Sequence, residues 1–398
     1  MYGSKHINNR NYRSLVIAGI GTIGRSLVSL GTEQFSLFEK VFATDKDCLC
    51  LAQLQDSGMI CHAGDITDPQ FLKTLMTSVP SPCLFVNLCS GTNNITIRNN
   101  LAPFETAYLD SCASITGDPD EYRFSRLMPY TYKDVDCRYP HWLCWGINPG
   151  LVEIIARRIL SDLPDKYRMY DVAVYEFDRL ENKKSTDKAA VGWCPEALVE
   201  ETMLSPTMEI EDGRPREDTG PGTRGCLINW ENEPIPARIV GHEDIWNLSE
   251  IPAVKNGSFY YSLSPEVMEI LNMDDAQKAR SMLSIPAAGD VITGLEQVAV
   301  QVKADFLAEP KTLVWTEDHR TTWNDHGVNA VQYQTAKSLL LAIMLLQRTA
   351  YGREALASHA SNLPINSRDW PIFDRFMDEL NINWQDGALL NLHVIGEI

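Results

Sequence analysis

The sequence predicts an α/β fold, in which a doubly wound parallel sheet is followed by a second domain of mixed α+β structure. Two observations lead to this prediction. A glycine-rich turn at residues 19–24 lies between an apolar strand-like run and a helix-like run, and short apolar runs then alternate with helix-length segments. Because about 150 residues make one domain, the 398-residue chain is long enough for two or three.

The first domain is expected over residues 1–148, with the helical residues 328–398 packing back on it, and the second over residues 149–327. The strands of the first domain are predicted where apolar runs recur with helix-length segments between them. These runs are residues 14–18, 40–45, 81–88, 107–111 and 141–146, with a further strand before Gly64.

The pattern changes after Asn148, where strand-like runs at residues 170–175 and 225–230 are joined by long polar loops. Such a mixture is typical of an α+β domain. Residues 209–222 are rich in Gly, Pro and charged side chains and are predicted to form a mobile loop. An apolar helical pattern over residues 336–346 predicts a helix near the C-terminus.

The composition limits the possible partners. The chain has 35 Lys and Arg against 53 Asp and Glu, a net charge of −18, which argues against nucleic acid or an anionic membrane and favours cationic or small neutral ligands. The longest apolar run, residues 339–346, is too short for a membrane span, and residues 1–14 hold no secretory signal pattern. The ten Cys show no zinc or disulfide spacing, so reduced thiols and a cytoplasmic location are expected.

The strongest local motif is Gly19-x-Gly21-x-x-Gly24, because a strand-like run precedes it, a helix-like run follows it and an acid lies 21 residues further on. The first Gly permits a tight turn, the second lets the backbone approach a pyrophosphate, and the third lets the helix pack closely. A glycine turn without a ligand is the alternative. The motif predicts a Rossmann-type dinucleotide site that includes Gly19, Gly21, Thr22, Ile23 and Gly24.

The acid after this motif, Asp45, is expected to accept hydrogen bonds from the adenosine ribose and to repel the 2′-phosphate of NADP. NAD is therefore the expected cofactor, although the neighbouring Lys46 is a group that accommodates such a phosphate in some sites. Asp65 and Ile66 are expected to border the adenine, with a cap on the helix that starts near Asp68 as the equal alternative for Asp65.

The fourth predicted strand ends in Asn87, Leu88 and Cys89. Ligands of open α/β sheets lie at the carboxyl ends of the strands. These three residues are therefore expected to line the nicotinamide side of the cofactor site.

Three features of the second half suit a cationic substrate. Trp193 lies in a Gly- and Pro-framed loop, where its face would hold an ammonium group, unless it is a buried packing residue. Glu231 and Glu233 follow a strand-like run, and isolated surface acids are the alternative for them. Asp290 and Glu296 flank a short apolar run and are further candidates for binding an amine.

No other chemistry is indicated. His319 and His326 are seven residues apart without a third metal ligand nearby, so no metal site is predicted. The chain contains no G-x-S-x-G run and no phosphate-binding Walker loop, which leaves hydrolase and phosphoryl-transfer functions without support.

The order of these motifs resembles bacterial homospermidine synthase, within the wider saccharopine dehydrogenase-like group, over most of the chain. The resemblance extends across both halves of the sequence. It rests on the glycine motif, Tyr108-x-Asp110-x-Cys112, Gly146-Ile-Asn148-Pro149-Gly150, Gly192-Trp193, residues 225–228, residues 293–296 and Tyr333-Gln334.

This resemblance implies an NAD-dependent enzyme that oxidises a primary amine such as putrescine to an imine, condenses it with a second amine and reduces the product. It also implies a homodimer whose second domain binds substrate and mediates dimerisation. By similarity Trp193 is the cation–π residue, Asn148 contacts substrate, and Glu231 or Glu233 acts with Glu296 as amine anchor. Asp110 and the Asn148-Pro149 pair are assigned to the cofactor site in the same way.

Two alternatives stay open. A basic cluster of Arg214, Arg216, Arg224 and Arg238 in the second half would suit a carboxylate, as an opine or carboxyspermidine dehydrogenase-like reductive aminase needs. A non-catalytic NAD-binding sensor on the same fold is the other alternative.

Overall fold

The computed structural model describes residues 11–54, 57–113, 123–133, 135–136, 138–164, 166–183, 188–220, 222–350, 357–366 and 368–397. The chain divides into two compact units. Unit 1 comprises Met1–Asp118, Leu127–Gly146 and Ala336–Leu380, and unit 2 comprises Pro119–Arg126, Ile147–Thr335 and Asn381–Ile398.

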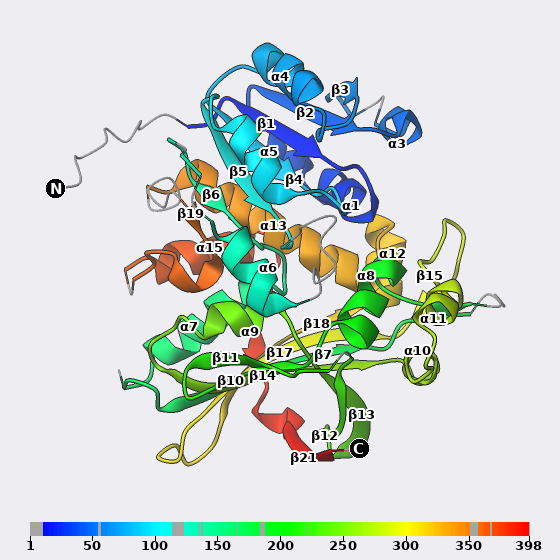
Figure 1. Cartoon of the computed structure of the whole chain (residues 1–398), viewed down its shortest axis with the longest axis vertical. Coiled ribbons are helices and arrows are strands. Elements are labelled where there is room, and N and C mark those ends of the chain that lie inside the picture. The colour runs from blue at the N-terminus through cyan, green and yellow to red at the C-terminus, as the bar shows by residue number, and fades with distance from the viewer. Residues whose placement is uncertain are drawn as a thin grey trace. The chain divides into compact units, whose positions relative to one another are not determined.

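Unit 1 contains a seven-stranded sheet in the order β19-β6-β5-β4-β1-β2-β3, with every neighbouring pair parallel (Figure 1, most strands blue to cyan). The order 3-2-1-4-5-6 within it is that of the doubly wound dinucleotide-binding fold. The predicted fold class is therefore confirmed. The strands are β1 (Ser14–Ala18), β2 (Lys40–Asp45), β3 (Ile60–Ala63), β4 (Cys83–Asn87), β5 (Thr106–Asp110), β6 (His141–Trp142) and β19 (Ala357–Ser358).

The central strands of this sheet are buried, as expected for apolar runs covered on both faces of a parallel sheet, whereas the edge strand β3 is mostly exposed. β1, β4 and β5 are buried at every position. The helices that accompany the sheet are α1 (Thr22–Leu30), α2 (Thr32–Phe35), α3 (Cys48–Ala52), α4 (Pro69–Ser78), α5 (Asn94–Leu101), α6 (Phe124–Thr131), α13 (Ala330–Arg348) and α15 (Trp370–Glu379).

Unit 2 is built on a ten-stranded mixed sheet whose main path is β20-β18-β17-β7-β14-β13-β12-β21 (Figure 1). β7 and β14 pair in parallel, and the other pairings are antiparallel. Its strands are β7 (Tyr170–Asp178), β10 (Met208–Glu211), β11 (Arg214–Glu217), β12 (Arg224–Trp230), β13 (Glu233–Val240), β14 (Val254–Leu263), β17 (Leu295–Lys303), β18 (Lys311–Asp318), β20 (Gln385–Asp386) and β21 (His393–Glu397).

Short elements complete unit 2. Two small sheets pair β15 (Leu283–Ser284) with β9 (Ala189–Ala190) and β16 (Ile292–Thr293) with β8 (Glu181–Asn182). The helices are α7 (Leu151–Ser161), α8 (Pro195–Val199), the π-helix η1 (Glu200–Leu204), α9 (Glu243–Leu248), α10 (Pro265–Leu271), α11 (Ala276–Ser281) and α12 (His319–His326). The 3₁₀ turns η2 (Ala360–Asn362) and η3 (Ala388–Leu390) belong to units 1 and 2 respectively.

Two predictions about this half need correction. Residues 209–222 do not form a simple loop, because β10 and β11 pair as a hairpin. Its turn is Asp212-Gly213, with φ values of 49° and 71°, the Asp-Gly turn that suits tight hairpins. Residues 381–397 also differ from the prediction, because they belong to unit 2, where β20 and β21 pair with strands of its sheet.

Among the residues that the structure describes, no helix combines the length and the apolar character needed to cross a membrane.

Candidate functional site

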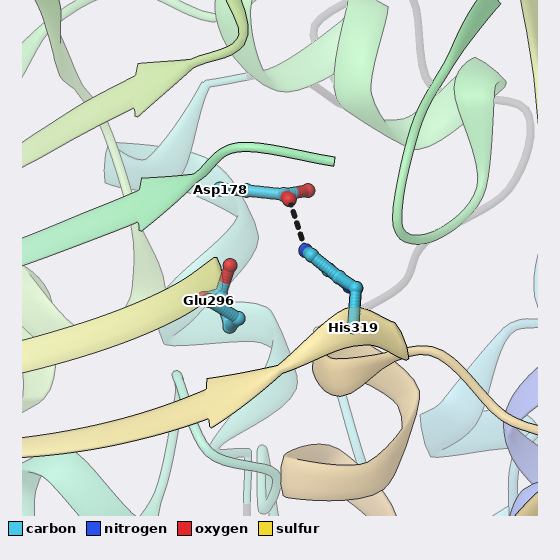
Figure 2. Close-up of side chains that lie close together, drawn as sticks. All are labelled: Asp178, Glu296 and His319. Carbon is cyan, nitrogen blue, oxygen red and sulfur yellow. Dashed lines mark hydrogen bonds and ion pairs between the residues drawn. The ribbon is translucent and has the colours of Figure 1, made fainter. Parts of the chain in front are cut away.

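Three buried side chains of unit 2 converge where three neighbouring strands end. Asp178 is the last residue of β7, Glu296 is the second residue of β17, and His319 follows the last residue of β18. Asp178 and Glu296 are register partners in the antiparallel pairing of β7 with β17, so both point to the same face of the sheet. Figure 2 shows Asp178 and His319 pointing toward each other, with Glu296 beside them.

The two carboxylates of this group each have an oxygen without a partner. Asp178 Oδ1 accepts hydrogen bonds from the Leu180 N–H at 3.0 Å and from His319 Nε2 at 2.9 Å (Figure 2). Asp178 Oδ2 and Glu296 Oε2 are buried and have no hydrogen-bond partner among the described residues, and both side chains belong to residues that are 1% exposed. Burying a polar oxygen without a hydrogen-bond donor is costly, and more so when it carries charge. These two oxygens therefore point to a missing ligand with hydrogen-bond donors.

Glu176 adds a third acid to the same face, since it lies two residues before Asp178 on β7. Glu176 and Glu296 are hydrogen-bonded to each other, which requires one of the two carboxyl groups to hold a proton. Burial, with the nearby charge of Glu201, raises the pKa of Glu176 to about 8. Burial, with the charges of Glu176 and Asp178, also raises the pKa of Glu296 well above its usual range. The pair therefore keeps a proton at neutral pH, and Asn148 Nδ2 donates a hydrogen bond to Glu176.

The side of the unit 2 sheet that carries Glu176, Asp178 and Glu296 is called the acidic face below. Tyr261 and Trp193 extend it. Tyr261 on β14 is the register partner of Glu176, and its hydroxyl accepts a hydrogen bond from Trp193 Nε1 at 3.0 Å. Burial, with the charge of Glu176 and neighbouring acids, raises the pKa of Tyr261 well above its usual range, so the hydroxyl stays protonated. Trp193 itself is half-buried. Burial raises the pKa of Glu201 in η1 to about 7, against the opposing effect of a neighbouring His.

His319 belongs to this group, although no role was predicted for it. Its Nδ1 accepts a hydrogen bond from the Ala330 N–H at 3.1 Å, so Nε2 carries the ring proton and donates it to Asp178. Asp178, Glu296 and His319 each offer one ligand atom, and these three atoms lie within 4.8 Å of one another, the spacing of a metal site. The proton on Nε2 leaves the ring without a lone pair directed at such an ion, and an ammonium group fits the two free carboxylate oxygens better.

Of the residues predicted for the substrate site, three come together on this face. Asn148 and Glu296 are both hydrogen-bonded to Glu176, and Trp193 is hydrogen-bonded to Tyr261, the register partner of Glu176. Asp290 does not join them, because its carboxylate accepts hydrogen bonds from Asn182 and the Ala287 N–H in a separate loop.

Glu231 and Glu233 are not part of this group, which corrects the prediction of both as amine anchors. Glu231 lies in the tight turn between β12 and β13 and is exposed. Glu233 is the register partner of Trp230, and Trp230 stacks on Phe177 and donates a hydrogen bond to Gln297. Phe177 and Gln297 alternate with the acids on their strands, so Trp230 and Glu233 belong to the opposite face of the sheet.

Sequence reasoning missed Glu176, Asp178, Glu201 and Tyr261. The signal for the first two was present, because β7 is an apolar strand whose last residues read Glu-Phe-Asp. Acids at alternate positions near the end of a buried strand share one face, and a buried face accepts a charge only with a partner. Tyr261 and Glu201 carried no comparable signal, since strand pairing and a π-helical turn bring them to the group.

The glycine motif of unit 1 forms a tight turn between β1 and α1. Gly19 has φ +90°, and a Cβ there would lie 2.7 Å from the Leu88 carbonyl carbon. A Cβ on Gly24 would lie 2.0 Å from Gly19 O, so the third glycine lets α1 pack against the turn. Gly21 is the N-cap of α1 and has no side chain to cap the helix, whose first turn also holds no acid. The first N–H groups of α1, which begins with Thr22 and Ile23, are thus left without a side-chain cap.

Asp45 ends β2 and supports this turn. Its Oδ2 accepts a hydrogen bond from the Ile20 N–H at 2.7 Å, and its Oδ1 accepts one from the Asp47 N–H at 2.8 Å. Each oxygen keeps a second lone pair for another donor. Asp65 does not cap α4, because its carboxylate accepts from Thr67 while Asp68 is the N-cap.

Other residues predicted to contact the cofactor are occupied by the protein itself. The side chain of Ile66 belongs to the apolar core of unit 1. Asn87 donates hydrogen bonds to Asn94 and Tyr108, and its Oδ1 accepts one from the Cys89 N–H. Asp110 accepts hydrogen bonds from the Cys144 N–H at 2.7 Å and from Asn94 at 3.1 Å. Asn87 and Asp110 therefore join the carboxyl ends of β4 and β5 to neighbouring segments, and Leu88 and Cys89 are half-buried at the same edge. Pro149 is buried in unit 2.

No family model and no curated protein matches the chain. Solved structures match over nearly its whole length. The homospermidine synthase of Legionella pneumophila, in complex with NAD, has a TM-score of 0.73 and 12% identity, covering 94% of this chain and 92% of its own. The saccharopine dehydrogenase (L-Glu forming) of Saccharomyces cerevisiae, without ligand, has a TM-score of 0.59 and 10% identity, covering 96% and 100%. The chain shares the fold of these two enzymes.

Proposed function

We propose that this protein is an NAD-dependent oxidoreductase that acts on a primary amine, with homospermidine synthase-like chemistry. The observation that carries the proposal is a pair of buried oxygens, Asp178 Oδ2 and Glu296 Oε2, which have no hydrogen-bond partner among the described residues and lie on the face where Trp193 is bonded to Tyr261. A protonated amine supplies up to three N–H donors and a positive charge, so it satisfies both oxygens at once.

Amine oxidation needs a protonated nitrogen for binding and a neutral nitrogen at the reacting carbon. The acidic face suits both. An ammonium end is bound by carboxylates and by the face of an indole, as Asp178 and Trp193 allow. The reacting nitrogen has to lose its proton before its carbon is oxidised. The Glu176–Glu296 pair already shares one proton, and it is the group proposed to exchange a proton with that nitrogen.

The residues of unit 1 fit NAD. The uncapped N-terminus of α1 suits the pyrophosphate, and the glycines at positions 19, 21 and 24 let the backbone approach it. Asp45 has lone pairs free for the two ribose hydroxyls, and its charge disfavours a 2′-phosphate. Bound NAD would supply a reversible hydride acceptor for the amine-bearing carbon, and the protein would orient the substrate and exclude water.

The proposed reaction is balanced without an external oxidant. The C–H bond of the amine-bearing carbon gives up its hydride and the nitrogen its proton, which leaves an imine. A second amine adds to the imine carbon and ammonia leaves. The hydride then returns to the carbon of the new imine and the proton to its nitrogen, so two amines yield one secondary amine and ammonia.

The decisive experiment incubates the purified protein with single di- and polyamines and a catalytic amount of NAD. Mass spectrometry of products and an ammonia assay are the readouts. A condensed secondary amine together with ammonia supports the proposal. Stoichiometric NADH consumption in the presence of an oxo acid would support the reductive aminase instead, and neither product with any amine would leave only the NAD-binding sensor.

The reductive aminase is less well supported, because two of the four arginines of the basic cluster are already paired within the protein. Arg224 pairs with Glu209 and Asp218, and Arg238 donates hydrogen bonds to Thr223 and to the Leu271 carbonyl. Arg214 and Arg216 are exposed on the β10–β11 hairpin.

The assembly and the location of the protein are further parts of the proposal. By resemblance, the enzyme acts as a cytoplasmic homodimer, with unit 2 as the substrate-binding and dimerisation domain. Light scattering of the purified chain measures the mass in solution and tests the dimer.

A further inference from the structure

The loop that carries Trp193 is anchored through the Gly192 carbonyl, whose two hydrogen-bond donors lie far away in the sequence. Gly192 O accepts hydrogen bonds from Asn329 Nδ2 at 2.8 Å and from Gln332 Nε2 at 3.2 Å. Both donors are buried at the start of α13. Since Gly192 directly precedes Trp193, these two amides fix the backbone from which the indole projects.

The orientation of both amides is set by a reciprocal pair of hydrogen bonds. The Gln332 N–H donates to Asn329 Oδ1 at 3.0 Å, and the Asn329 N–H donates to Gln332 Oε1 at 3.3 Å. Each side-chain oxygen is thus used in capping the helix, which leaves each NH₂ group to donate to Gly192 O. The helix cap and the anchor of the Trp193 loop are the same two side chains.

The same segment also contacts the acids. A Cβ on Gly192 would lie 2.4 Å from Val331 Cγ2 and 2.9 Å from Asp178 Oδ2, so the glycine backbone lies directly against both. Between Asn329 and Gln332, the Ala330 N–H donates to His319 Nδ1, and His319 in turn donates to Asp178. One turn of backbone therefore supports the Trp193 loop and the carboxylate that faces it.

We propose that Asn329 and Gln332 are positioning residues for amine binding, which hold the Trp193 indole at the acidic face through the Gly192 carbonyl. This inference rests on the proposed function for its kinetic consequence. The position of the indole is a separate, measurable property that does not depend on turnover.

The test uses Asn329→Asp and Gln332→Glu. Each variant keeps the side-chain oxygen that caps α13 and replaces the donor to Gly192 O with a second oxygen. Asp is as good an N-cap as Asn, so the helix start is retained. The matched control is Asn229→Asp, which removes a similar buried amide donor from the Asn391 carbonyl, a bond of 2.7 Å elsewhere in unit 2.

Two readouts are combined. Steady-state kinetics with the best amine gives KM and kcat. Acrylamide quenching of each variant, compared with the same variant carrying Trp193→Phe, isolates the fluorescence of Trp193. We expect KM to rise about tenfold with kcat within about twofold, because an anchor lost from the binding surface weakens binding more than the chemical step. We also expect Trp193 in both variants to be quenched about twice as strongly, with Asn229→Asp like wild type.

Wild-type quenching of Trp193 in both donor variants would overturn the inference, and so would equal changes in Asn229→Asp, which would indicate general loosening. If the wild-type protein turns over no amine, the proposed function fails while the quenching result still decides whether Asn329 and Gln332 position Trp193. Increased quenching confined to the two donor variants supports the positioning role in either case.

Discussion

The two candidate sites of this chain are built from different parts of the polypeptide. At the glycine turn of unit 1 the side chains nearby are occupied: Asp45 accepts two backbone N–H groups, and Asn87 and Asp110 bind neighbouring segments. What remains for a ligand is mainly backbone at the start of α1, together with the second lone pair of each Asp45 oxygen. On the acidic face of unit 2 the backbone is paired in a sheet, and side-chain oxygens of Asp178 and Glu296 remain free.

This difference between backbone and side-chain groups determines what each site recognises. Backbone N–H groups at a helix start attract any negative phosphate and vary little with the side chains around them. A face of buried acids recognises a particular charge and number of donors, and it does so at a cost in stability. The second site should therefore respond strongly to single isosteric substitutions and the first only moderately.

The largest effect is expected from Asp178→Asn, which preserves shape but removes the charge that faces the amine. We expect kcat/KM for the amine to fall about 100-fold or more, since an unpaired buried charge partner costs about 2 to 5 kcal/mol. Steady-state kinetics measures it. Asp171→Asn, the same substitution at an exposed position of β7, is the control and should behave as wild type. An Asp178→Asn enzyme with wild-type kcat/KM would remove Asp178 from the substrate site.

The same difference decides how much could be predicted from sequence. The glycine turn and Asp45 are local, within one strand–turn–helix–strand unit, so their spacing is visible in the sequence and, with the alternating apolar runs, predicted the fold class. The acidic face is assembled from β7, β14, β17 and the residue after β18, and only pairing register brings Glu176, Asp178 and His319 together. Glu231 and Glu233 were chosen because they follow a strand, but the side of the sheet depends on that register as well.

Smaller effects are expected from replacing Trp193 and Trp230, two tryptophans on opposite faces of the unit 2 sheet. Trp193 is half-buried beside the acids, so Trp193→Ala should raise KM for the amine about tenfold, the size of a cation–π contact. Trp230 is 3% exposed in the apolar core on the other face, so Trp230→Ala should lower the free energy of unfolding by about 3 to 5 kcal/mol.

Kinetics and denaturant unfolding on both variants separate these roles. We expect Trp193→Ala to unfold near the wild-type midpoint and folded Trp230→Ala to keep the wild-type KM. If the two variants exchanged these behaviours, the assignment of the faces would be wrong.

A third effect is the pH dependence of stability. Burial raises the pKa of Glu176 to about 8 from an ordinary value of 4.5. The folded state therefore binds more protons than the unfolded state between these values. The contribution of Glu176 to stability is fully present below about pH 4.5 and is lost as the pH rises through about 8.

Glu176→Gln removes this contribution, so its free energy of unfolding should fall less steeply with pH and should exceed that of wild type above pH 8. Glu201 and Glu296 act in the same direction, so some slope remains. Urea unfolding across this range measures it, with Glu231→Gln on the exposed turn as control. An unchanged slope in Glu176→Gln would mean that Glu176 is not buried as described.

The smallest effect is expected at the glycine turn, from Asp45→Ala. The variant loses the acceptor for the Ile20 N–H, which lowers the affinity for any dinucleotide. It also loses the acceptor for the ribose hydroxyls, which lowers the affinity for NAD alone. It also loses the charge that repels a 2′-phosphate, which helps NADP. We therefore expect the Kd of NAD to rise about tenfold and that of NADP to rise less, measured by calorimetry. Asp68→Ala, which removes the N-cap of α4, should leave the ratio of the two Kd values unchanged. Equal losses for both cofactors would show that Asp45 supports the turn but does not select NAD.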